Sequence, residues 1–373
     1  MNAVERWLAI AVGVSGVQEW SCLAVDYIRF YVDDAEHWRQ YYCNIWNFSE
    51  RSRWQSAHTL DIWLSHARIH ILLSQAIAPE SPVARYRGHQ AQGVAEVGLQ
   101  VKHLDRAVEH LKRSLDVHWL PSWNGGRDRG VRLQTPFGIC HTLIERSGLP
   151  QLGDGLLPDT PHSNPVRSDL DDEVAFTHID HVVLNVGCGQ LDDAMQWYEQ
   201  AFGLELLDRF DIQTPYSGLR SVVMGRRDRG LQLPINEPTH PQSQVQEFLD
   251  ANGGAGIQHV AFHSSDIARS VRRLRERGVE FLSVPPTYYA QLATSPHLRD
   301  RVEQLRANRL LADLEPPDRL LVQTFARPLF GEPTFFYEIV QRQRRAIGFG
   351  EGNFQALYEA IERDQQQRTG LRR

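Results

Sequence analysis

The sequence contains few cysteines, and they lie far apart. Cys22, Cys43, Cys140 and Cys188 form no CxxC pair. Isolated cysteines make neither a disulfide framework nor a cysteine-based zinc site. We therefore expect reduced, structural thiols and a cytoplasmic protein.

An excess of positive charge is also missing. The formal net charge is −6, and the arginine-rich runs RRLRERG and QRQRRA are short and separate. Proteins that bind nucleic acids carry a basic surface that contacts the phosphates. Nucleic acid is therefore not an expected partner.

The apolar run near the N-terminus is too short to cross a membrane. It extends from Trp7 to Val17, and it lacks the basic start and the small-residue cleavage site of a signal peptide. We expect residues 1–20 to be an N-terminal extension, and we expect no membrane partner.

The rest of the composition is that of a globular protein. Hydrophobic residues make up 42% and charged residues 23% of the 373 residues, close to the averages of folded domains. A chain of this length is expected to form two domains, or one domain that is duplicated.

Two pairs of similar segments indicate an internal duplication. Residues 25–46 and residues 178–206 each show a strand pattern followed by an acidic turn and an amphipathic helix with aromatic residues. Residues 93–112 and residues 256–278 each show a strand, an aspartate-led turn and a helix. Four strand–helix openings in two related pairs predict that the chain repeats itself.

A segment rich in proline, glycine, aspartate and serine separates the two copies. It covers residues 151–173 and has no sustained apolar period, so it is the predicted linker. We expect an N-terminal structural domain at residues 21–150 and a catalytic domain at residues 174–373. Each helix is followed by several strands rather than one, which predicts an α+β fold with curved mixed sheets.

A glutamate in a predicted strand is the first sign of a functional site. Glu338 lies in the middle of the run from Thr334 to Gln341, which is rich in β-branched and aromatic residues. It either faces water on an edge strand or needs a positively charged partner. His181 and His259 lie in the middle of two other predicted strands, and two histidines with one carboxylate are the ligand set of a non-haem Fe(II) site.

The duplication supplies an internal control for this ligand set. Superposing the copies places three other residues at the equivalent positions of the first half, namely Tyr27, Glu96 and Thr142. A single histidine in a strand is more often a core residue than a ligand. Three coincident positions in one copy, and none in the other, favour a metal site in the second half only.

The motifs of the second half resemble those of 4-hydroxyphenylpyruvate dioxygenase, a family of the vicinal-oxygen-chelate superfamily. The resemblance is carried by IDHVVLNV, YSGLRSVVM, LPINEP, GAGIQHVAF, PTFFYEIVQR and GFGEGNF, which lie in order within residues 178–365. The first half matches more weakly, through YIRFYVDDAEHW, GVAEVGLQV and HTLIER. The run RRAIGFG is similar to that of cyanobacterial members.

The resemblance implies a fold and a set of site residues. The fold is two tandem vicinal-oxygen-chelate domains of duplicated βαβββ modules, with an open barrel in the C-terminal half that holds Fe(II). The implied ligands are His181, His259 and Glu338. The implied catalytic residues that act on the substrate are Ser221, Asn236, Gln244 and Gln323. The implied substrate-binding residues are Pro234, Phe336, Phe349 and Phe354. Taken alone, each amide is better explained by a bond to its own backbone, and each phenylalanine by core packing.

The resemblance also implies a reaction and partners. Its substrates are 4-hydroxyphenylpyruvate and O₂, which oxidative decarboxylation, ring hydroxylation and side-chain migration convert to homogentisate and CO₂. The product serves tyrosine catabolism or tocopherol biosynthesis, and the protein is expected to be a homodimer or homotetramer. A C-terminal helix after Asn353 is expected to close over the pocket.

Three alternatives stay open. A 4-hydroxymandelate synthase shares the substrate, but its members carry a smaller aliphatic residue at the position of Phe354. An extradiol ring-cleaving dioxygenase would need a further catalytic histidine, for which His263 and His240 are the candidates. A metal-free small-molecule binding protein would have the same fold, which the complete ligand set argues against.

Overall fold

The computed structural model describes Trp20 and residues 22–125, 128–146, 174–213, 218–228, 230–315, 318–331 and 333–353. Three predicted features lie outside the described residues. These are residues 1–19 of the N-terminal extension, the linker at 151–173, and the helix after Asn353 together with Phe354.

The described strands and helices fall into two halves. The first half contains β1 (Cys22–Val32), α2 (Ala35–Asn44), β2 (Ser49–Gln55), β3 (Thr59–His66), β4 (Ile69–Ala76), α3 (Pro82–Arg87), β5 (Gly93–Val101), α4 (Leu104–Ser114), β6 (His118–Gly125), β7 (Asp128–Gln134) and β8 (Cys140–Glu145). The second half contains β9 (Phe176–Asn185), α5 (Leu191–Phe202), β10 (Glu205–Gln213), β11 (Gly218–Gly225), β12 (Gln232–Pro238), α6 (Gln244–Asn252), β13 (Gly256–Ser264), α7 (Ile267–Glu276), α8 (Pro286–Leu292), α9 (Val302–Asn308), β14 (Leu311–Glu315), β15 (Arg319–Phe325) and β16 (Phe336–Gln343), with short 3₁₀ turns at Arg299–Arg301 and Glu351–Asn353.

Each half forms one eight-stranded sheet, and the two sheets have the same topology. The strand order is β2-β3-β4-β1-β5-β8-β7-β6 in the first sheet and β10-β11-β12-β9-β13-β16-β15-β14 in the second. Each sheet is built from two βαβββ modules that meet at an antiparallel pair, β1 with β5 and β9 with β13. The predicted duplication and the α+β class are therefore confirmed.

Four of the described helices, α2, α3, α6 and α7, begin at an aspartate or serine whose side chain caps the first turn. The carboxylate of Asp34 accepts a hydrogen bond from the backbone N–H of His37 at the start of α2, and Asp266 does the same at the start of α7. Helix α5 carries two aspartates in its first turn and ends at Gly203, whose φ of 64° is the left-handed conformation that glycine adopts without strain. No described helix has the length and apolar character needed to cross a bilayer.

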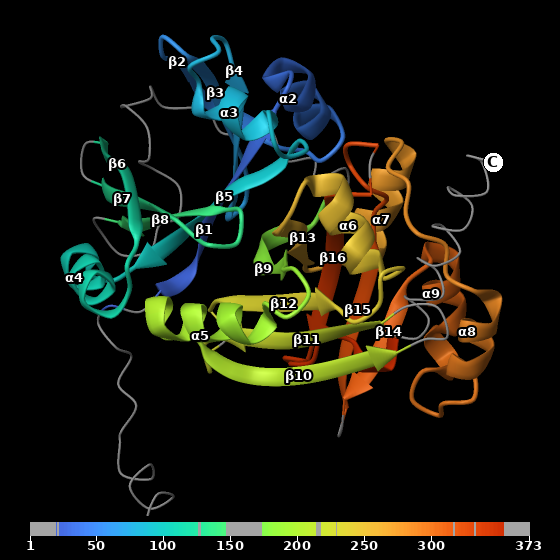
Figure 1. Ribbon diagram of the computed structural model, residues 1–373. Coiled ribbons are helices and arrows are strands. Elements are labelled where there is room, and N and C mark those ends of the chain that lie inside the picture. Colours follow the sequence, from blue (N-terminus) through green and yellow to red (C-terminus); the bar gives the residue numbers. More distant parts are fainter. Residues whose placement is uncertain are drawn as a thin grey trace, which may run out of the picture.

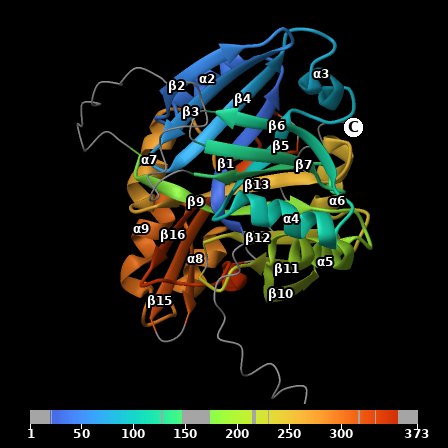
Figure 2. The same ribbon diagram turned by 90° about the vertical axis from the view of Figure 1, so that its left-hand side faces the viewer.

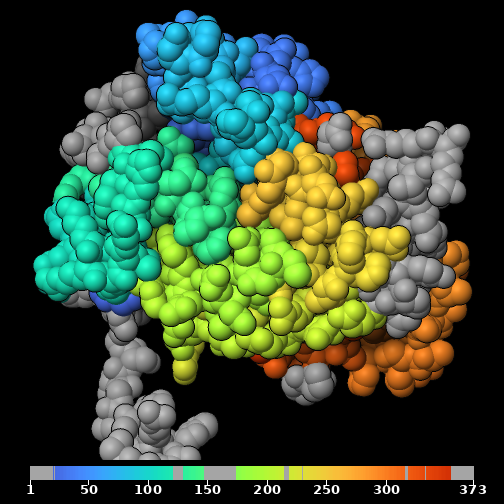
Figure 3. Space-filling view, viewed as in Figure 1, coloured from blue at the N-terminus to red at the C-terminus, as the bar shows by residue number. Residues whose placement is uncertain are grey.

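The two halves share one hydrophobic core. The ring of Phe30 packs edge-on against Phe335, and Trp46 packs against Tyr337, with ring centroids 5.0 and 4.8 Å apart. Figures 1 and 2 show α4 of the first half beside α5 of the second, and in Figure 3 the teal surface of the first half meets the yellow-green surface of the second. The two halves, which the sequence predicts as two domains, therefore pack directly against each other.

Candidate metal centre

Three neighbouring strands of the second sheet bring the two histidines and the glutamate together. Ala261 of β13 pairs with His181 of β9 on one side and with Glu338 of β16 on the other. His259 lies two residues before Ala261 and therefore points to the same face of the sheet. Because β16 lies between β13 and β15, Glu338 is buried, with 4% of its surface exposed. It does not face water on an edge strand.

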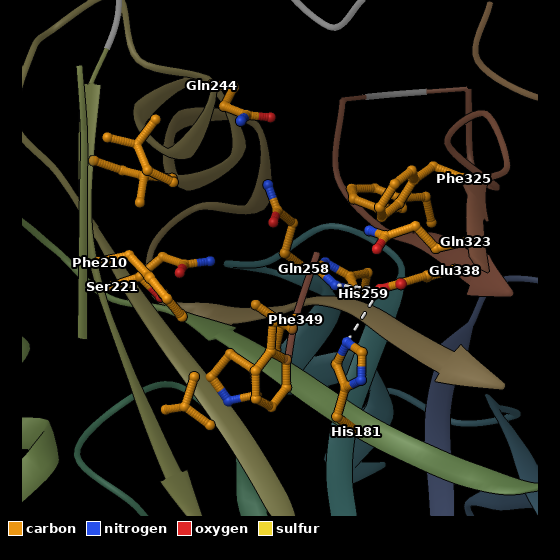
Figure 4. A pocket seen from close by; sticks show the side chains of 17 residues that line it. His181, Phe210, Ser221, Gln244, Gln258, His259, Gln323, Phe325, Glu338 and Phe349 are labelled. Carbon is orange, nitrogen blue, oxygen red and sulfur yellow. Dashed lines mark hydrogen bonds and ion pairs between the residues drawn. The ribbon is translucent and has the colours of Figure 1, made fainter. Parts of the chain in front are cut away.

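The spacing of these side chains fits a single metal ion. His181 Nε2 lies 3.1 Å and His259 Nε2 lies 3.5 Å from Glu338 Oε2, and the donor atoms all lie within 4.8 Å of one another. Ligands about 2.1 Å from a metal and at right angles to each other are about 3 Å apart. In Figure 4 the three side chains converge on one side of the pocket, opposite Phe210 and Ser221. We call them the metal triad.

The charges of the metal triad depend on one another. Burial opposes protonation of His181, but the carboxylate of Glu338 and the hydrogen bond to Asp180 outweigh it and raise the pKa of His181 to about 9. Burial alone would raise the pKa of Glu338, yet the positive charge of His181 holds it below the usual value. Burial lowers the pKa of His259. A divalent cation would therefore compete with a proton shared by His181 and Glu338.

The equivalent positions of the first half are filled by a hydrogen-bonded cluster. Gly98 pairs with Tyr27 and with Thr142, as Ala261 pairs with the outer members of the metal triad. Tyr27 and Thr142 both donate to Oε1 of Glu96, and the Arg132 guanidinium lies 2.7 Å from Glu96 Oε2. The described residues of this half contain no group of metal ligands. The predicted equivalence of the two triads is thus borne out by the register.

The two halves also differ in how tightly side chains pack at the small residue between the outer members of each triad. Gly98 has no Cβ, and the ring of Tyr27 lies so close that an added Cβ would be 2.4 Å from its Cδ1. The ring of Tyr27 therefore packs directly against the backbone at Gly98, whereas the methyl group of Ala261 belongs to an apolar cluster with Leu321, Val340 and Ala346. The first half could not hold a metal ion here without moving Tyr27.

Most residues predicted to act on the substrate line the same pocket as the metal triad. They are Ser221, Pro234, Asn236, Gln244, Gln323, Phe336 and Phe349. Ser221 and Asn236 face each other across β11 and β12, and Gln244 is the first residue of α6. The amide of Asn236 donates to Asn185 Oδ1 at 3.1 Å, so its neighbour and not its own backbone fixes it.

Several pocket residues were not foreseen from the sequence. They are Val183, Phe210, Ile212, Leu219, Val223, Gln258 and Phe325. Gln258 was missed because neighbouring residues of a regular strand point to opposite faces, and His259 already faces the pocket. The pairing of β13 with β9 is irregular between Ile257 and His259, and this bulge lets both residues reach the pocket.

The carboxylate of Asp180 was also missed. Its Oδ1 lies 2.8 Å from Nδ1 of His181, and it accepts two hydrogen bonds from Arg342, each 2.8 Å long. The first half contains the same pair, Asp26 with Arg146, at the equivalent positions. The repeat could have revealed this pair, because VDY and IDH align, as do HTLIER and YEIVQR.

The two histidines considered for an extradiol enzyme lie away from the pocket. The ring of His263 is 2.8 Å from the hydroxyl of Thr177 and stacks on His178. His240 is exposed, and its Nδ1 accepts from the backbone N–H of Gln242. Neither could act on a substrate bound at the metal triad in this conformation.

The fold and the metal triad are those of the glyoxalase and dioxygenase superfamily, and comparisons with known proteins support this class. Residues 178–301 match the Glyoxalase/Bleomycin resistance protein/Dioxygenase superfamily. Among solved structures, a mutant of 4-hydroxymandelate synthase from Streptomyces coelicolor superposes with a TM-score of 0.78 at 26% identity, covering 92% of this chain and 99% of that one.

The particular family follows from relatives that align along most of the chain. The 4-hydroxyphenylpyruvate dioxygenase of Caenorhabditis elegans is 34% identical over 94% of this chain and 93% of its own length, and that of Xenopus tropicalis is 31% identical over the same shares. An uncharacterized protein of Synechocystis is 36% identical over 90% of this chain and 96% of its own length. The chain belongs to the 4-hydroxyphenylpyruvate dioxygenase family.

Proposed function

We propose that this protein is an Fe(II)-dependent dioxygenase that converts 4-hydroxyphenylpyruvate and O₂ to homogentisate and CO₂. The observation that carries the proposal is the complete metal triad, with His181 and Glu338 buried and His259 partly buried, facing a pocket of uncharged amides and phenylalanines in a member of this family. Metal-free binding is the weaker alternative, because a binding protein has no need to bury two histidines around a carboxylate.

The metal triad would hold Fe(II), and Fe(II) in such a site supplies the redox chemistry for a keto acid and O₂ bound together. His181, His259 and Glu338 belong to three adjacent strands of one sheet, so they are fixed relative to one another. Their ligand atoms face the same pocket as the amides, so a substrate bound by these amides would lie beside the metal.

The amides would bind the polar ends of the substrate. Gln244, Gln258 and Gln323 enter from α6, β13 and β15, and together with Asn236 they offer both donors and acceptors without a charge. Uncharged groups can orient a phenol or a keto acid without competing with the metal triad for the cation. We propose that they act as the catalytic positioning groups.

The phenylalanines would form the walls around the aromatic ring. Phe336 stacks on His259 with ring centroids 4.8 Å apart, and Phe349 packs edge-on against His181 at 5.4 Å. Rings so close to two metal ligands limit the access of water to the reacting centre. We also propose Phe354 as a substrate-binding residue, on the family resemblance alone.

We propose that the first half, residues 21–150, is a structural domain and that residues 174–373 form the catalytic domain. The buried cluster of Tyr27, Glu96 and Thr142 supports this division, because these residues bond to one another and to arginine. The residues predicted to act on the substrate all come from the second half.

The test combines metal analysis, oxygen uptake and product analysis. Purified protein should bind one Fe(II) per chain and consume O₂ only when 4-hydroxyphenylpyruvate is added. Chromatography against both standards should show homogentisate as the main product. Mainly 4-hydroxymandelate would replace the proposed reaction by that of the synthase, and no oxygen uptake by the iron-loaded protein would contradict both.

A further inference from the structure

Asp180 is a buried carboxylate that contacts a metal ligand but does not line the pocket. It is 7% exposed, and its Oδ1 lies 2.8 Å from Nδ1 of His181. The guanidinium of Arg342 donates two hydrogen bonds of 2.8 Å to this carboxylate, which favours its charged form. An ionised carboxylate at this position accepts the Nδ1–H of His181, which leaves the Nε2 lone pair facing the metal site.

The guanidinium of Arg342 also forms hydrogen bonds with a second segment of the chain. Its Nη1 donates to the backbone carbonyls of Ala346 at 3.2 Å and Gly348 at 2.7 Å. The guanidinium also lies over the ring of Phe349, 5.6 Å from its centroid. One arginine therefore bonds to the partner of His181 and to the segment that carries Phe349 into the pocket.

This segment, residues 346–349, returns alongside β16 through a tight turn. Arg344 and Arg345 adopt φ values of 52° and 59°, a left-handed conformation that is unfavourable for residues other than glycine. Glu315 accepts hydrogen bonds from the N–H groups of Ile347 and Gly348, at 2.9 and 2.6 Å. Specific side chains therefore hold the segment in place, although the turn that precedes it is energetically unfavourable.

A comparison with the first half shows which of these contacts the two halves share. Asp26 and Arg146 form the same two-bond pair beside Tyr27, whose hydroxyl bonds to Glu96 instead of binding a metal. A buried aspartate–arginine pair is therefore present with or without a ligand histidine next to it. In the second half this pair contacts the metal ligand His181, and Arg342 also bonds to the carbonyls of Ala346 and Gly348.

We propose that Asp180 and Arg342 are positioning residues that couple the metal ligand His181 to the Phe349 segment. The geometry makes the two ends of this unit dependent on each other, because movement of Arg342 towards either one breaks its bonds to the other. Coupling of this kind is reciprocal: metal binding orders residues 346–349, and an ordered segment strengthens metal binding. The inference rests on the proposed iron site.

The first experiment measures Fe(II) affinity by competition with a chelator in the absence of oxygen. Asp180→Asn should bind Fe(II) about 10- to 100-fold more weakly, the usual effect of removing a carboxylate behind a ligand histidine. Asp26→Asn is the matched control, since it disrupts the same pair in the first half, and it should leave the affinity within about twofold. Equal losses in both variants, or no loss in Asp180→Asn, would refute the role of Asp180. Failure of the unmodified protein to bind Fe(II) would instead refute the proposed function.

The second experiment follows amide hydrogen exchange in residues 346–349 with and without Fe(II). Iron should slow this exchange in the unmodified protein and in Arg146→Lys, but not in Arg342→Lys, because lysine cannot bond to Asp180 and to two carbonyls at once. A role that is merely structural would raise exchange equally with and without iron. Protection by iron that persists in Arg342→Lys would overturn the coupling.

Discussion

Ala261 and Gly98 occupy equivalent positions between the outer members of the two triads, and they differ in what packs against them. Ala261 pairs with His181 and Glu338, and its methyl group belongs to an apolar cluster with Leu321, Val340 and Ala346. At Gly98 even a methyl group would collide with the ring of Tyr27. The identity of one small residue thus goes together with a metal site in one half and a packed aromatic ring in the other.

Replacing His259 by alanine should remove iron and turnover together. The change deletes one of three donors, and the two that remain do not complete the ligand set. Glu96→Gln is the control at the equivalent position of the first half. It should leave the iron content unchanged but lower the melting temperature, because Arg132 loses its buried negative partner and Arg29 loses one of two, Asp61 being the other. Metal analysis and thermal unfolding give both readings, and an active, iron-loaded His259→Ala protein would contradict the assignment.

Gly98→Ala should destabilise the protein without changing iron binding. The added Cβ would lie 2.4 and 2.5 Å from two ring carbons of Tyr27, so the ring must move. Overpacking of this kind costs about 1–3 kcal/mol of unfolding free energy. Gly93→Ala in the same strand is the control, because its Cβ would meet nothing within 4 Å. Unfolding in urea should separate the two variants, and equal stability would show that Tyr27 yields without cost.

The residues of the site could be predicted from the sequence where the repeat isolates them. His181, His259 and Glu338 differ in chemistry from their counterparts, so comparing the halves exposes them. Gln258 could not be found in this way, because a bulge in β13 turns it into the pocket and bulges leave no clear pattern in the sequence.

The central strands that carry the metal triad were predicted better than the strands at the edges of the sheets. The run predicted from Thr334 to Gln341 is β16, Phe336–Gln343, and its pattern is clear because both neighbours bury it. The edge strands β2 and β10 contain few buried residues, and their sequences SERSRWQ and ELLDRFDIQ are mostly polar. Such strands are formed by pairing with a neighbour, which a local pattern does not show.

Helix α6 carries a pocket residue at its first position, so its cap should affect catalysis. The hydroxyl of Ser243 accepts a hydrogen bond from the N–H of Val245 at 3.2 Å, directly beside Gln244. Ser243→Ala should cost about 1 kcal/mol of unfolding free energy and should lower kcat/KM for 4-hydroxyphenylpyruvate while iron stays bound. Asp34→Ala removes the cap of α2 in the first half and should cost stability only. Equal kinetics in both variants would show that Gln244 does not depend on the cap.

The shared core makes the two halves a single unit of stability. Tyr42 of α2 and Tyr337 of β16 join their hydroxyl groups at 2.6 Å in the buried interior. We expect one unfolding transition, with equal calorimetric and van't Hoff enthalpies. Two resolved transitions would show that the halves unfold independently.

This sharing could not be predicted from the sequence. Periodic apolar residues show which face of an element is buried but not which element covers it. Phe30 and Phe335 contact each other although about 300 residues separate them in the chain, and the linker pattern alone indicated two domains.

The contact between the halves also predicts how stability depends on pH. His141 of β8 is buried, with Nδ1 3.0 Å from the carbonyl of Val97 and Nε2 3.0 Å from the hydroxyl of Tyr198 in α5. The neutral imidazole satisfies both partners by donating to the carbonyl and accepting from the hydroxyl. Burial lowers the pKa of His141 to about 4.

The pKa of His141 is lower in the folded than in the unfolded protein. Its full contribution to stability is therefore present only at a pH where the histidine is also neutral in the unfolded protein. Its contribution is complete above about pH 6.5, falls as the pH drops towards 4, and amounts to about 3 kcal/mol for a shift of this size. His70, whose pKa burial also lowers to about 4, acts in the same direction. Between about pH 6.5 and 4.5 the unfolding free energy, measured in urea, should therefore decrease with falling pH. His141→Gln should start from a lower stability but lose less of it over this range, because glutamine takes up no proton. A variant with the slope of the unmodified protein would show that His141 is not held neutral at the contact between the halves.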